Sequence, residues 1–472
     1  MIQSLFPTLR AGFRGDLFRP ALIEASGAVL SYADLLARSG AMAAALLARG
    51  LKAGDRIVVQ TSKSVDALLL YLAALRAGIV YVPLNPAHTR AELDYFLEDA
   101  EPGLFVDDAE LARLAAAPVA DFAEPALGPD DLAAILYTSG TTGRSKGALL
   151  SQGNLASNAA TLIREWRFTE ADRLIHALPI FHVHGLFVAT HCVIGSGAAM
   201  LWQPGFDADA IVRALPDASV LMGVPTFYTR LLAKDGLTPD LCGNMRLFVS
   251  GSAPLSAETH REWQARTGHR ILERYGMTET GMLSSNPYDG DRRAGSVGPP
   301  LPGVAIRIAG ADADGVGGIE VKGPNVTRGY WRNAEKTAEA FTADGWFETG
   351  DLGRFDGDGY LWIVGRAKDL IISGGFNVYP AEVEAAIEVL DGVAEVAVIG
   401  APHPDFGEGV VAVVVPRAGA EVSPHAVSDA LRETLAAYKR PKTVLIRDAL
   451  PRNAMGKVEK AVLRRELASA FD

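Results

Sequence analysis

Residues 137–147 read Tyr137-Thr138-Ser139-Gly140-Thr141-Thr142-Gly143-Arg144-Ser145-Lys146-Gly147 and decide the fold. They follow the apolar run 132–136, which predicts a buried strand. The three glycines let backbone N–H groups approach an anion closely, and successive N–H groups in such a turn form an anion-binding nest. The hydroxyl groups add donors and the two cations add positive charge. The segment therefore favours a polyphosphate ligand.

Two common phosphate loops are excluded by spacing. A Walker A loop needs Gly-Lys-Ser/Thr beginning five residues after its first glycine, but Ser145 stands there and Gly147 follows Lys146. The chain also contains no G-x-G-x-x-G. On composition alone, a flexible surface loop remains the alternative.

Length and charge limit the class of protein. A chain of 472 residues exceeds one ordinary core, so two or more domains are expected. The 56 acidic residues outnumber the 45 basic ones, which argues against a nucleic-acid or anionic-membrane partner. The two cysteines, Cys192 and Cys242, match no metal spacing and are interpreted as buried thiols in a reducing compartment.

No segment reads as a targeting signal or a membrane span. The N-terminal residues lack the features of a signal or transit peptide. The longest stretch without a formal charge, 185–206, is interrupted by His191, two glycines and Pro204. It is interpreted as buried helix, turn and strand rather than a membrane span. A cytoplasmic location is expected.

Strands and helices alternate through the first part of the chain. A strand at 56–60, a helix at 64–77 and a strand at 79–83 predict a βαβ unit in a covered parallel sheet. Further strands are predicted at 219–224, 245–249 and 270–274, with a helix at 256–267. In such α/β sheets ligands bind beyond the carboxyl ends of strands. The segments expected to converge on one cleft are 137–147, 250–254 and 275–280.

From Gly298 onward the pattern changes to alternating strands and turns. The antiparallel strands are expected at 304–308, 318–322 and 360–364. The boundary is predicted at 365–369, beyond which lies a unit of about a hundred residues, large enough for its own core. Its predicted elements are helices at 381–390 and 424–437 and strands at 393–399, 410–415 and 443–447. The predicted fold is α/β, with domain 1–366 combining covered, mostly parallel sheets and a distorted antiparallel β subdomain, and with a small mobile α+β domain at 367–472.

The stretch 137–147 resembles the phosphate loop of the AMP-forming acyl-CoA synthetases, the family that also holds adenylation domains and firefly luciferases. Further stretches match the same family in its order along the chain, at 178–185, 275–280, 349–351, 365–378 and 451–457. The resemblance implies ATP, Mg²⁺ and coenzyme A as cofactors. It also implies a two-step reaction, in which a carboxylate and ATP give an acyl adenylate and pyrophosphate, and the thiol then displaces AMP.

The hexapeptide 275–280 carries groups suited to a nucleotide. A Tyr offers a face for a base, a Thr hydroxyl can bind phosphate, and a Glu can hold Mg²⁺ together with substrate phosphates. The resemblance implies these roles for Tyr275, Thr278 and Glu279, with Thr141 as a second residue near the metal. The other residues assigned to the nucleotide site are Thr138, Ser139, Gly140, Thr142, Gly143, Lys146, Gly251, Ser252, Ala253, Glu273, Arg274, Gly276 and Met277.

The last three matching stretches, at 349–351, 365–378 and 451–457, supply the ribose site and the mobile domain. The turn Thr349-Gly350-Asp351 is expected to follow a strand. By resemblance, Asp351 binds the ribose with help from Arg366, and Lys368 is the hinge about which the small domain rotates. The turn Ser373-Gly374-Gly375 carries backbone toward the thiol channel. The resemblance makes Lys457 the catalytic lysine, which would bridge carboxylate and α-phosphate as negative charge builds in the transition state. It also suggests a lysine-acylating regulator, since acylation would remove the charge.

The identity of the acid depends on two stretches. In residues 178–185, a second histidine at 184 stands where many fatty-acid members carry an apolar residue, which predicts a polar pocket. An arginine at 293 is expected to pair with a second carboxylate of the substrate, because a fatty acid would leave it buried and unpaired. Together with 250–253, these stretches resemble those of the malonyl-CoA synthetases and predict malonate. The predicted acid-site residues are His182, which is also assigned to catalysis, Val183, His184, Ser252, Met277 and Arg293.

Several alternatives stay open from the sequence. A medium-chain or aryl acid–CoA ligase would need Arg293 to face solvent, and a carrier-loading adenylation module would need a carrier protein as acceptor. The choice between malonate and methylmalonate is also open, as is whether His182 or His184 contacts the acid. The oligomeric state and the conformation of the small domain are not predicted.

Overall fold

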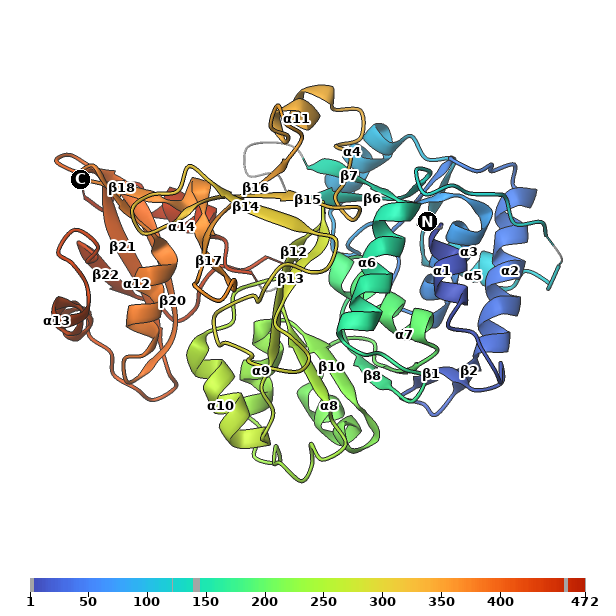
Figure 1. The fold of residues 1–472 in the computed structure, drawn as a ribbon, viewed down its shortest axis with the longest axis horizontal. Coiled ribbons are helices and arrows are strands. Elements are labelled where there is room, and N and C mark those ends of the chain that lie inside the picture. The colour runs from blue at the N-terminus through green and yellow to red at the C-terminus, as the bar shows by residue number, and fades with distance from the viewer. Residues whose placement is uncertain (1–3, 121, 139–144, 454–456, 472) are drawn as a thin grey trace. The chain divides into compact units, whose positions relative to one another are not determined.

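The computed structural model describes residues 4–120, 122–138, 145–453 and 457–471. These residues form two compact units (Figure 1). The N-terminal unit comprises Met1–Leu255, Thr259–Ile306 and Val321–Phe347, and the C-terminal unit comprises Ser256–Glu258, Arg307–Glu320 and Glu348–Asp472.

One sheet of the N-terminal unit contains the βαβ unit expected from the sequence. Its strand order is β5-β3-β4-β6-β7, with β5, β3, β4 and β6 parallel and β7 antiparallel to β6. The Ser64 side chain accepts a hydrogen bond from the Ala67 N–H and begins α3 (Val65–Ala77), and Gly78, with φ of 72°, ends it. The strands are β3 (Arg56–Val59), β4 (Val80–Pro83), β5 (Leu104–Val106), β6 (Leu132–Thr138) and β7 (Lys146–Ser151).

The second sheet of this unit has eight strands in the order β13-β12-β11-β10-β8-β9-β1-β2. The strands from β12 through β1 pair in parallel, and the two outermost pairs are antiparallel. The bounds are β1 (Pro20–Glu24), β2 (Val29–Ser31), β8 (Arg173–His176), β9 (Ala199–Trp202), β10 (Val220–Gly223), β11 (Leu247–Ser250), β12 (Leu272–Met277) and β13 (Gly281–Ser285).

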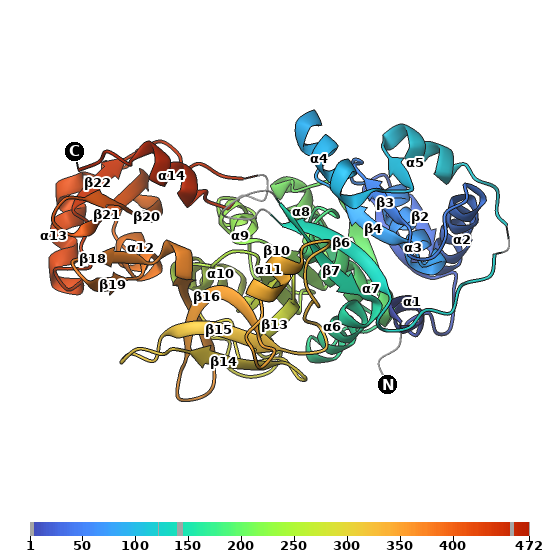
Figure 2. The ribbon, with the colours of Figure 1, turned by 90° about the horizontal axis from the view of Figure 1, so that it is seen from above.

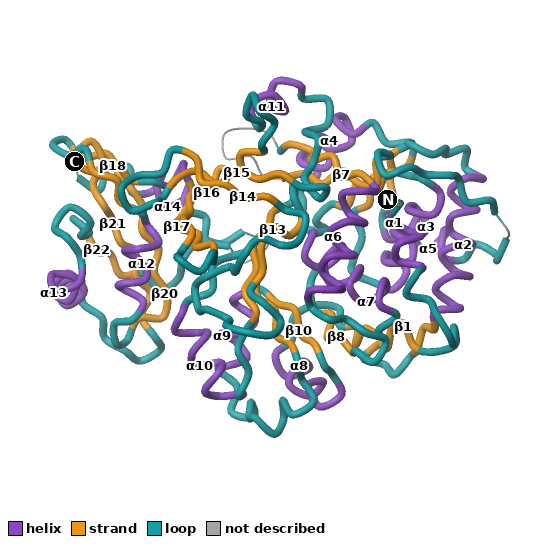
Figure 3. The backbone as a smooth tube through the Cα atoms, viewed as in Figure 1, coloured by secondary structure: helices purple, strands orange, loops and turns teal. Residues whose placement is uncertain are grey.

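Helices cover these sheets. Most of them share one large apolar core with the sheets, whereas α4 packs in a second cluster with residues of β3, β4 and β6. Helices α2, α3 and α5 contact one another, as Figure 2 shows, and so do α1, α6 and α7 (Figure 3). The remaining bounds are α1 (Leu5–Arg10), α2 (Tyr32–Ala48), α4 (Arg90–Ala100), α5 (Asp108–Ala115), α6 (Gln152–Glu165), the π-helix η1 (His184–Ala189), α7 (Thr190–Ser196), α8 (Ala208–Ala214), the 3₁₀ turn η2 (Leu215–Asp217), α9 (Pro225–Leu232), α10 (Ala257–Thr267) and α11 (Ala334–Glu339).

A third sheet has the order β14-β15-β16-β17, formed by β14 (Ala305–Ala309), β15 (Gly317–Lys322), β16 (Phe347–Phe355) and β17 (Leu361–Arg366). The 3₁₀ turn η3 (Ala367–Asp369) follows it. The predicted domain boundary falls at this turn, whereas the compact units separate at Phe347 because β16 and β17 group with the C-terminal residues.

The fourth sheet, of order β19-β18-β21-β20 with β22 beside β21, organises the C-terminal unit. Alternate residues of β20 enter two different apolar clusters, Val396 and Val398 in one and Ala397 and Ile399 in the other. This period of two means that both faces of the sheet are covered. Its elements are β18 (Ile371–Ser373), β19 (Phe376–Val378), α12 (Pro380–Glu388), β20 (Val393–His403), β21 (Gly407–Pro416), α13 (Pro424–Thr434), β22 (Thr443–Ile446) and α14 (Lys460–Glu466).

Two details of the predicted strand positions are wrong. Tyr275, Gly276 and Met277 lie inside β12 rather than beyond it, and Asp351 lies in the middle of β16 rather than after a strand. In both places a glycine next to polar residues read as a turn. Instead, β12 pairs with β13 across Gly276, and β16 includes Gly350 and pairs with β17 from Asp351 onward. Cys192 and Cys242 are buried free thiols, as expected. Among the described residues, no helix is long and apolar enough to cross a membrane.

A buried ion pair ties β8 to the start of β11. Arg246 donates through Nε to Asp172 Oδ1 (2.6 Å) and through Nη2 to Oδ2 (2.8 Å), and Asp172 is 3% exposed. Burial raises the pKa of Asp172, but hydrogen bonds from Arg246, Thr169 and Ser219 outweigh it and hold that pKa below its usual value. The pair is therefore fully hydrogen-bonded inside the fold.

We expect Arg246→Met to lower the free energy of unfolding by about 3–5 kcal/mol, because it leaves a buried carboxylate unpaired. The exposed pair of Arg328 with Asp130 provides a control, since Arg328→Met should cost less than about 1 kcal/mol. Urea unfolding followed by tryptophan fluorescence measures both. Because the pKa of folded Asp172 is depressed, its stabilisation is present above the ordinary Asp pKa and is lost as the pH falls through the folded value. Equal effects of the two variants would contradict the assignment.

Candidate active site

The phosphate-loop stretch joins two antiparallel strands. Thr138 ends β6 and Lys146 begins β7, and their Cα atoms are register partners. Residues Ser139, Gly140, Thr141, Thr142 and Gly143 lie outside the described residues. Thr138 Oγ1 donates to Glu279 Oε1 (3.5 Å), so the end of β6 meets the 275–280 stretch.

Glu279 lies in the turn between β12 and β13 and is 5% exposed. Besides the Thr138 contact, it accepts a hydrogen bond from the Tyr330 hydroxyl (3.1 Å). Burial, and then the Glu279 charge, raise the pKa of Tyr330, so the phenol remains the donor. Lys146 Nζ lies 5.2 Å from the centroid of the same Tyr330 ring. Sequence reasoning missed Tyr330, because a Gly-Tyr pair carries no distinctive signal.

A single carboxylate of this kind is suited to Mg²⁺. Among the described residues no group of three or more His, Cys, Asp or Glu side chains could hold a metal ion. Mg²⁺ commonly takes only one or two carboxylates and completes its shell with water and substrate phosphates. Glu279, buried and hydrogen-bonded by hydroxyls, fits that pattern.

The acid-site stretch turns from β8 into the π-helix η1. His184 begins η1 and is 1% exposed, and its N–H donates to His182 Nδ1 (3.4 Å). His184 Nδ1 lies 3.3 Å from Ser252 Oγ. Ser252 has φ of 71°, a left-handed conformation that is strained for a residue other than glycine and that clusters at functional sites. Two segments predicted to form the acid site therefore meet.

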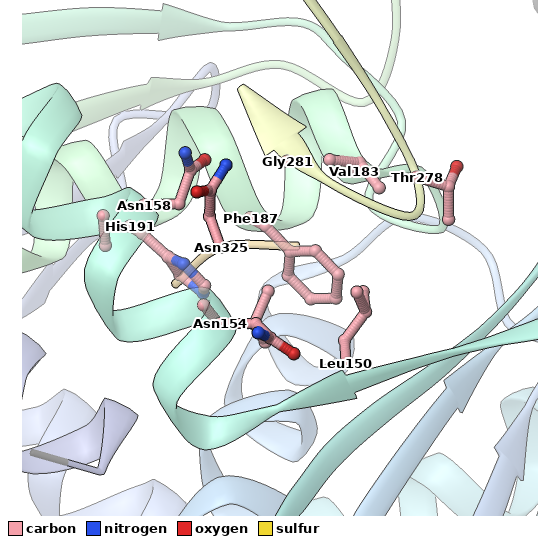
Figure 4. A pocket seen from close by; sticks show the side chains of 11 residues that line it. Leu150, Asn154, Asn158, Val183, Phe187, His191, Thr278, Gly281 and Asn325 are labelled. Atoms are coloured by element: carbon pink, nitrogen blue, oxygen red, sulfur yellow. The ribbon is translucent and has the colours of Figure 1, made fainter. Parts of the chain in front are cut away.

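A small cavity brings the acid-site stretch next to the nucleotide stretch. Its walls include Val183 and Thr278, together with Gly281 and side chains from α6 and β7 (Figure 4). Its volume is about 10 Å³, which is room for little more than one water molecule. The cavity is too small for an organic acid, but it shows that Val183 and Thr278, assigned to different substrates, line the same space.

Arg274 is a buried cation that lies against Gly251. It lies on β12, is 4% exposed, and its Nε and Nη2 atoms have no acceptor among the described residues. A Cβ added to Gly251 would come within 2.4 Å of its Cζ, so the guanidinium packs directly against the Gly251 backbone. Burial lowers the pKa of the guanidinium to about 9. An unpaired buried cation is costly unless a ligand supplies the counter-charge.

Arg293 is held at the end of a well-anchored loop. Its N–H donates to Asn286 Oδ1 (3.0 Å), and Gly295 N–H donates to the buried carboxylate of Glu273 (3.0 Å). Burial raises the pKa of Glu273 despite its hydrogen bond with His260. The Arg293 side chain is 27% exposed and pairs with Asp291 (Nε–Oδ2, 3.0 Å). Its predicted role toward the acid stays a prediction.

The C-terminal unit carries the remaining predicted residues. Asp351 and Arg366 are register partners on β16 and β17, and Arg366 Nε lies 3.0 Å from Asp351 Oδ1. Lys368, the predicted hinge, is exposed in η3.

Two turns of the same unit hold the other assigned groups. Gly374 and Gly375, with φ of 60° and 82°, form the two-residue turn between β18 and β19, which needs positive φ at both positions. The N–H of Lys457 donates to Asn453 Oδ1 (3.0 Å).

Comparisons with known proteins show the family to which the chain belongs. Residues 14–331 match the AMP-binding enzyme family, and residues 382–457 match the AMP-binding enzyme C-terminal domain. The chain is 52% identical to MatB from Rhodopseudomonas palustris in its ATP-bound crystal structure, with a TM-score of 0.96 and 100% of each chain covered.

Curated relatives act on different acids. A mitochondrial malonate–CoA ligase from Bos taurus is 35% identical, covering 97% of this chain and 90% of the relative. An indoleacetate–CoA ligase from Aromatoleum aromaticum is 36% identical, covering 93% of each. With both family domains matched over most of its length, the chain belongs to the AMP-binding enzyme family.

Proposed function

We propose that this protein is an ATP-dependent malonate–CoA ligase. In the first step, one malonate carboxylate attacks the α-phosphate of ATP, forming malonyl adenylate and releasing pyrophosphate. In the second step, the thiol of coenzyme A attacks the acyl carbon, forming malonyl-CoA and releasing AMP. Similarity to a malonate–CoA ligase and to MatB supports this reaction.

The buried guanidinium of Arg274 is the observation that carries the choice of acid, and we reassign this residue from the nucleotide site implied by the resemblance to the acid site. It is unpaired by the described residues and lies beneath Gly251, next to the Ser252–His184 contact. A monocarboxylic acid offers nothing to neutralise this cation once its only carboxylate is at the α-phosphate. A dicarboxylic acid has a second carboxylate, and pairing that group with a buried guanidinium is both strong and selective.

The other acid-site residues then have complementary roles. Ser252 and His184, which contact each other, donate hydrogen bonds to malonate. His182 accepts the backbone N–H of His184 through Nδ1. Val183 and Met277 flank the α-carbon and set the tolerance for the methyl group of methylmalonate. Arg293, whose side chain is 27% exposed, is a second candidate for the distal carboxylate.

The residues assigned to ATP bind the nucleotide and stabilise the negative charge that develops on its phosphates during adenylation. We assign Tyr275 to adenine and Thr278 to the α-phosphate, and Thr138 and Lys146 to the other phosphates. Glu279 would hold Mg²⁺, oriented by Tyr330 and Thr138. Bound there, Mg²⁺ supplies charge neutralisation to the polyphosphate.

Residues of the C-terminal unit complete the assignment. We assign Asp351 to the ribose hydroxyls, since its carboxylate is held by Arg366, and Lys457 to the charge that builds at the α-phosphate. Lys368 is the assigned hinge and Ser373–Gly375 the assigned thiol-channel turn. Acylation of Lys457 would abolish its charge, so a lysine-acylating enzyme is a candidate regulator. The cytoplasmic location remains a prediction.

An aryl acid–CoA ligase is the second candidate, because an indoleacetate–CoA ligase is as similar in sequence as the malonate enzyme. The two candidates differ in what they require of Arg274. An aryl pocket would have to leave this buried cation without a counter-charge, which disfavours it.

A panel of acids tests the proposal directly. Pyrophosphate release is measured with ATP, Mg²⁺ and coenzyme A for malonate, methylmalonate, succinate, butyrate, benzoate and indoleacetate. We expect malonate to have the highest kcat/KM, followed by methylmalonate. Preference for an aryl or monocarboxylic acid would refute the proposal, and a requirement for a carrier protein in place of coenzyme A would indicate a carrier-loading module.

We expect Arg274→Met to raise the KM for malonate at least about 30-fold, because loss of one partner of a buried charge pair costs about 2–5 kcal/mol. The KM for ATP should change little. Since the substitution removes an unpaired buried cation, the ligand-free variant should be no less stable to urea than the wild type. Arg293→Met is the matched comparison: if only that variant loses affinity for malonate, the distal carboxylate binds at Arg293 and the assignment to Arg274 is wrong.

We expect Lys457→Ala to block malonyl-adenylate formation while largely sparing the transfer of supplied malonyl adenylate to coenzyme A. The reason is that charge builds on the α-phosphate in the first step, where the lysine acts. Single-turnover assays measure the two half-reactions separately. Lys460→Ala, three residues away on α14, is the control and should leave both unchanged. Similar losses in both half-reactions for Lys457→Ala would show that the role is misassigned.

A further inference from the structure

Lys63 is a second cation without a carboxylate partner among the described residues, and it lies outside every motif discussed above. It occupies the connection between β3 and α3 and is half-buried. Its Nζ lies 3.1 Å from His176 Nδ1, donates to the His176 carbonyl oxygen (2.8 Å), and lies 4.4 Å from the centroid of the Trp202 ring. Burial lowers the pKa of this lysine well below its ordinary value.

The geometry determines which nitrogen of His176 carries the proton. His176 is 1% exposed, and its Nε2 lies 3.0 Å from the carbonyl oxygen of Gly185. Because a carbonyl only accepts, Nε2 must carry the hydrogen. Burial, and then the charge of Lys63, hold the pKa of His176 well below its usual value, so the ring is neutral and Nδ1 is an acceptor. Lys63 therefore donates to Nδ1 and selects this tautomer.

The Gly185 carbonyl, at the other end of this chain of contacts, receives three donors. Besides His176 Nε2, it accepts from Thr190 Oγ1 (2.9 Å) and from the Thr190 N–H that closes the π-helix η1. A Cβ on Gly185 would come within 2.1 Å of the Pro179 carbonyl oxygen, so no side chain is tolerated there. Single-turn π-helices are rare and occur frequently at functional sites. The carbonyl is thus held at the first turn of η1, one residue after His184.

We propose that Lys63 and His176 are positioning residues of the acid pocket, acting through the Gly185 carbonyl to hold η1 so that Val183 and His184 face the acid. The identity of that acid rests on the proposed function, whereas the contacts themselves do not. Neither residue touches the acid in this assignment. Because the His176 imidazole is neutral, it connects Lys63 to the Gly185 carbonyl through hydrogen bonds without placing a second charge in the interior.

Lys63→Met tests this relay, because methionine keeps an unbranched side chain but cannot donate. Lys63→Arg restores the cation, and Lys52→Met, at an exposed lysine before β3, is the control. Hydrogen exchange of the ligand-free protein is measured over residues 183–190, with the KM values for malonate and ATP. We expect Lys63→Met to speed exchange in this segment about tenfold or more and to raise the KM for malonate similarly, as for loss of one charge-assisted hydrogen bond. The KM for ATP should stay unchanged, and Lys63→Arg should recover at least part of the loss.

The outcomes separate the relay from the proposed function. Unchanged exchange in residues 183–190 overturns the relay. So does a general increase in exchange with equal changes in both KM values, which would make Lys63 merely structural. If the wild type fails to use malonate, the proposed function fails and the exchange data alone decide the relay. His176→Gln, which keeps a donor near Gly185 but lacks the ring nitrogen that accepts from Lys63, should slow exchange relative to His176→Ala if the carbonyl contact is what holds η1.

Discussion

Parallel pairing of β8, β10, β11 and β12 is the constraint on which the candidate site depends. Parallel strands end at the same edge of a sheet, and ligands of α/β proteins bind beyond that edge. Here the edge carries the turn into η1 after β8, the Gly251–Ala253 turn after β11, and the end of β12 with its turn to β13. The contact between Ser252 and His184, from segments 68 residues apart, is a direct consequence of that pairing.

Three buried or half-buried cations in this unit have three different kinds of environment. Arg246 is neutralised by Asp172, and the pair stabilises the fold. Lys63 is bound by neutral groups, an imidazole and a backbone carbonyl, and orients them. Arg274 has neither kind of partner among the described residues. Because an unpaired buried charge costs free energy in the ligand-free state, this difference distinguishes a binding group from structural ones.

Much of the architecture could be predicted from the sequence. The βαβ unit, the helix predicted at 64–77 and the parallel strands are all observed close to their expected positions. Strand ends near glycines were predicted less well, as at Gly276 and Gly350, because a glycine next to polar residues looks like a turn until its pairing partner is known. The predicted roles of Arg293 and Lys457 remain predictions.

The motifs and their order along the sequence were enough to recognise the family. Gly, Thr, Glu and Lys at fixed positions within a motif indicate nucleotide binding, and this does not depend on how the chain folds between the motifs. Tertiary structure alone decided which polar groups have partners. Arg274 reads in the sequence as one residue of a nucleotide motif, and Lys63 as an ordinary lysine. Their significance comes from burial beneath Gly251 and beside His176, contacts that depend on packing between distant segments. No local pattern encodes such packing, because it is set by the whole core.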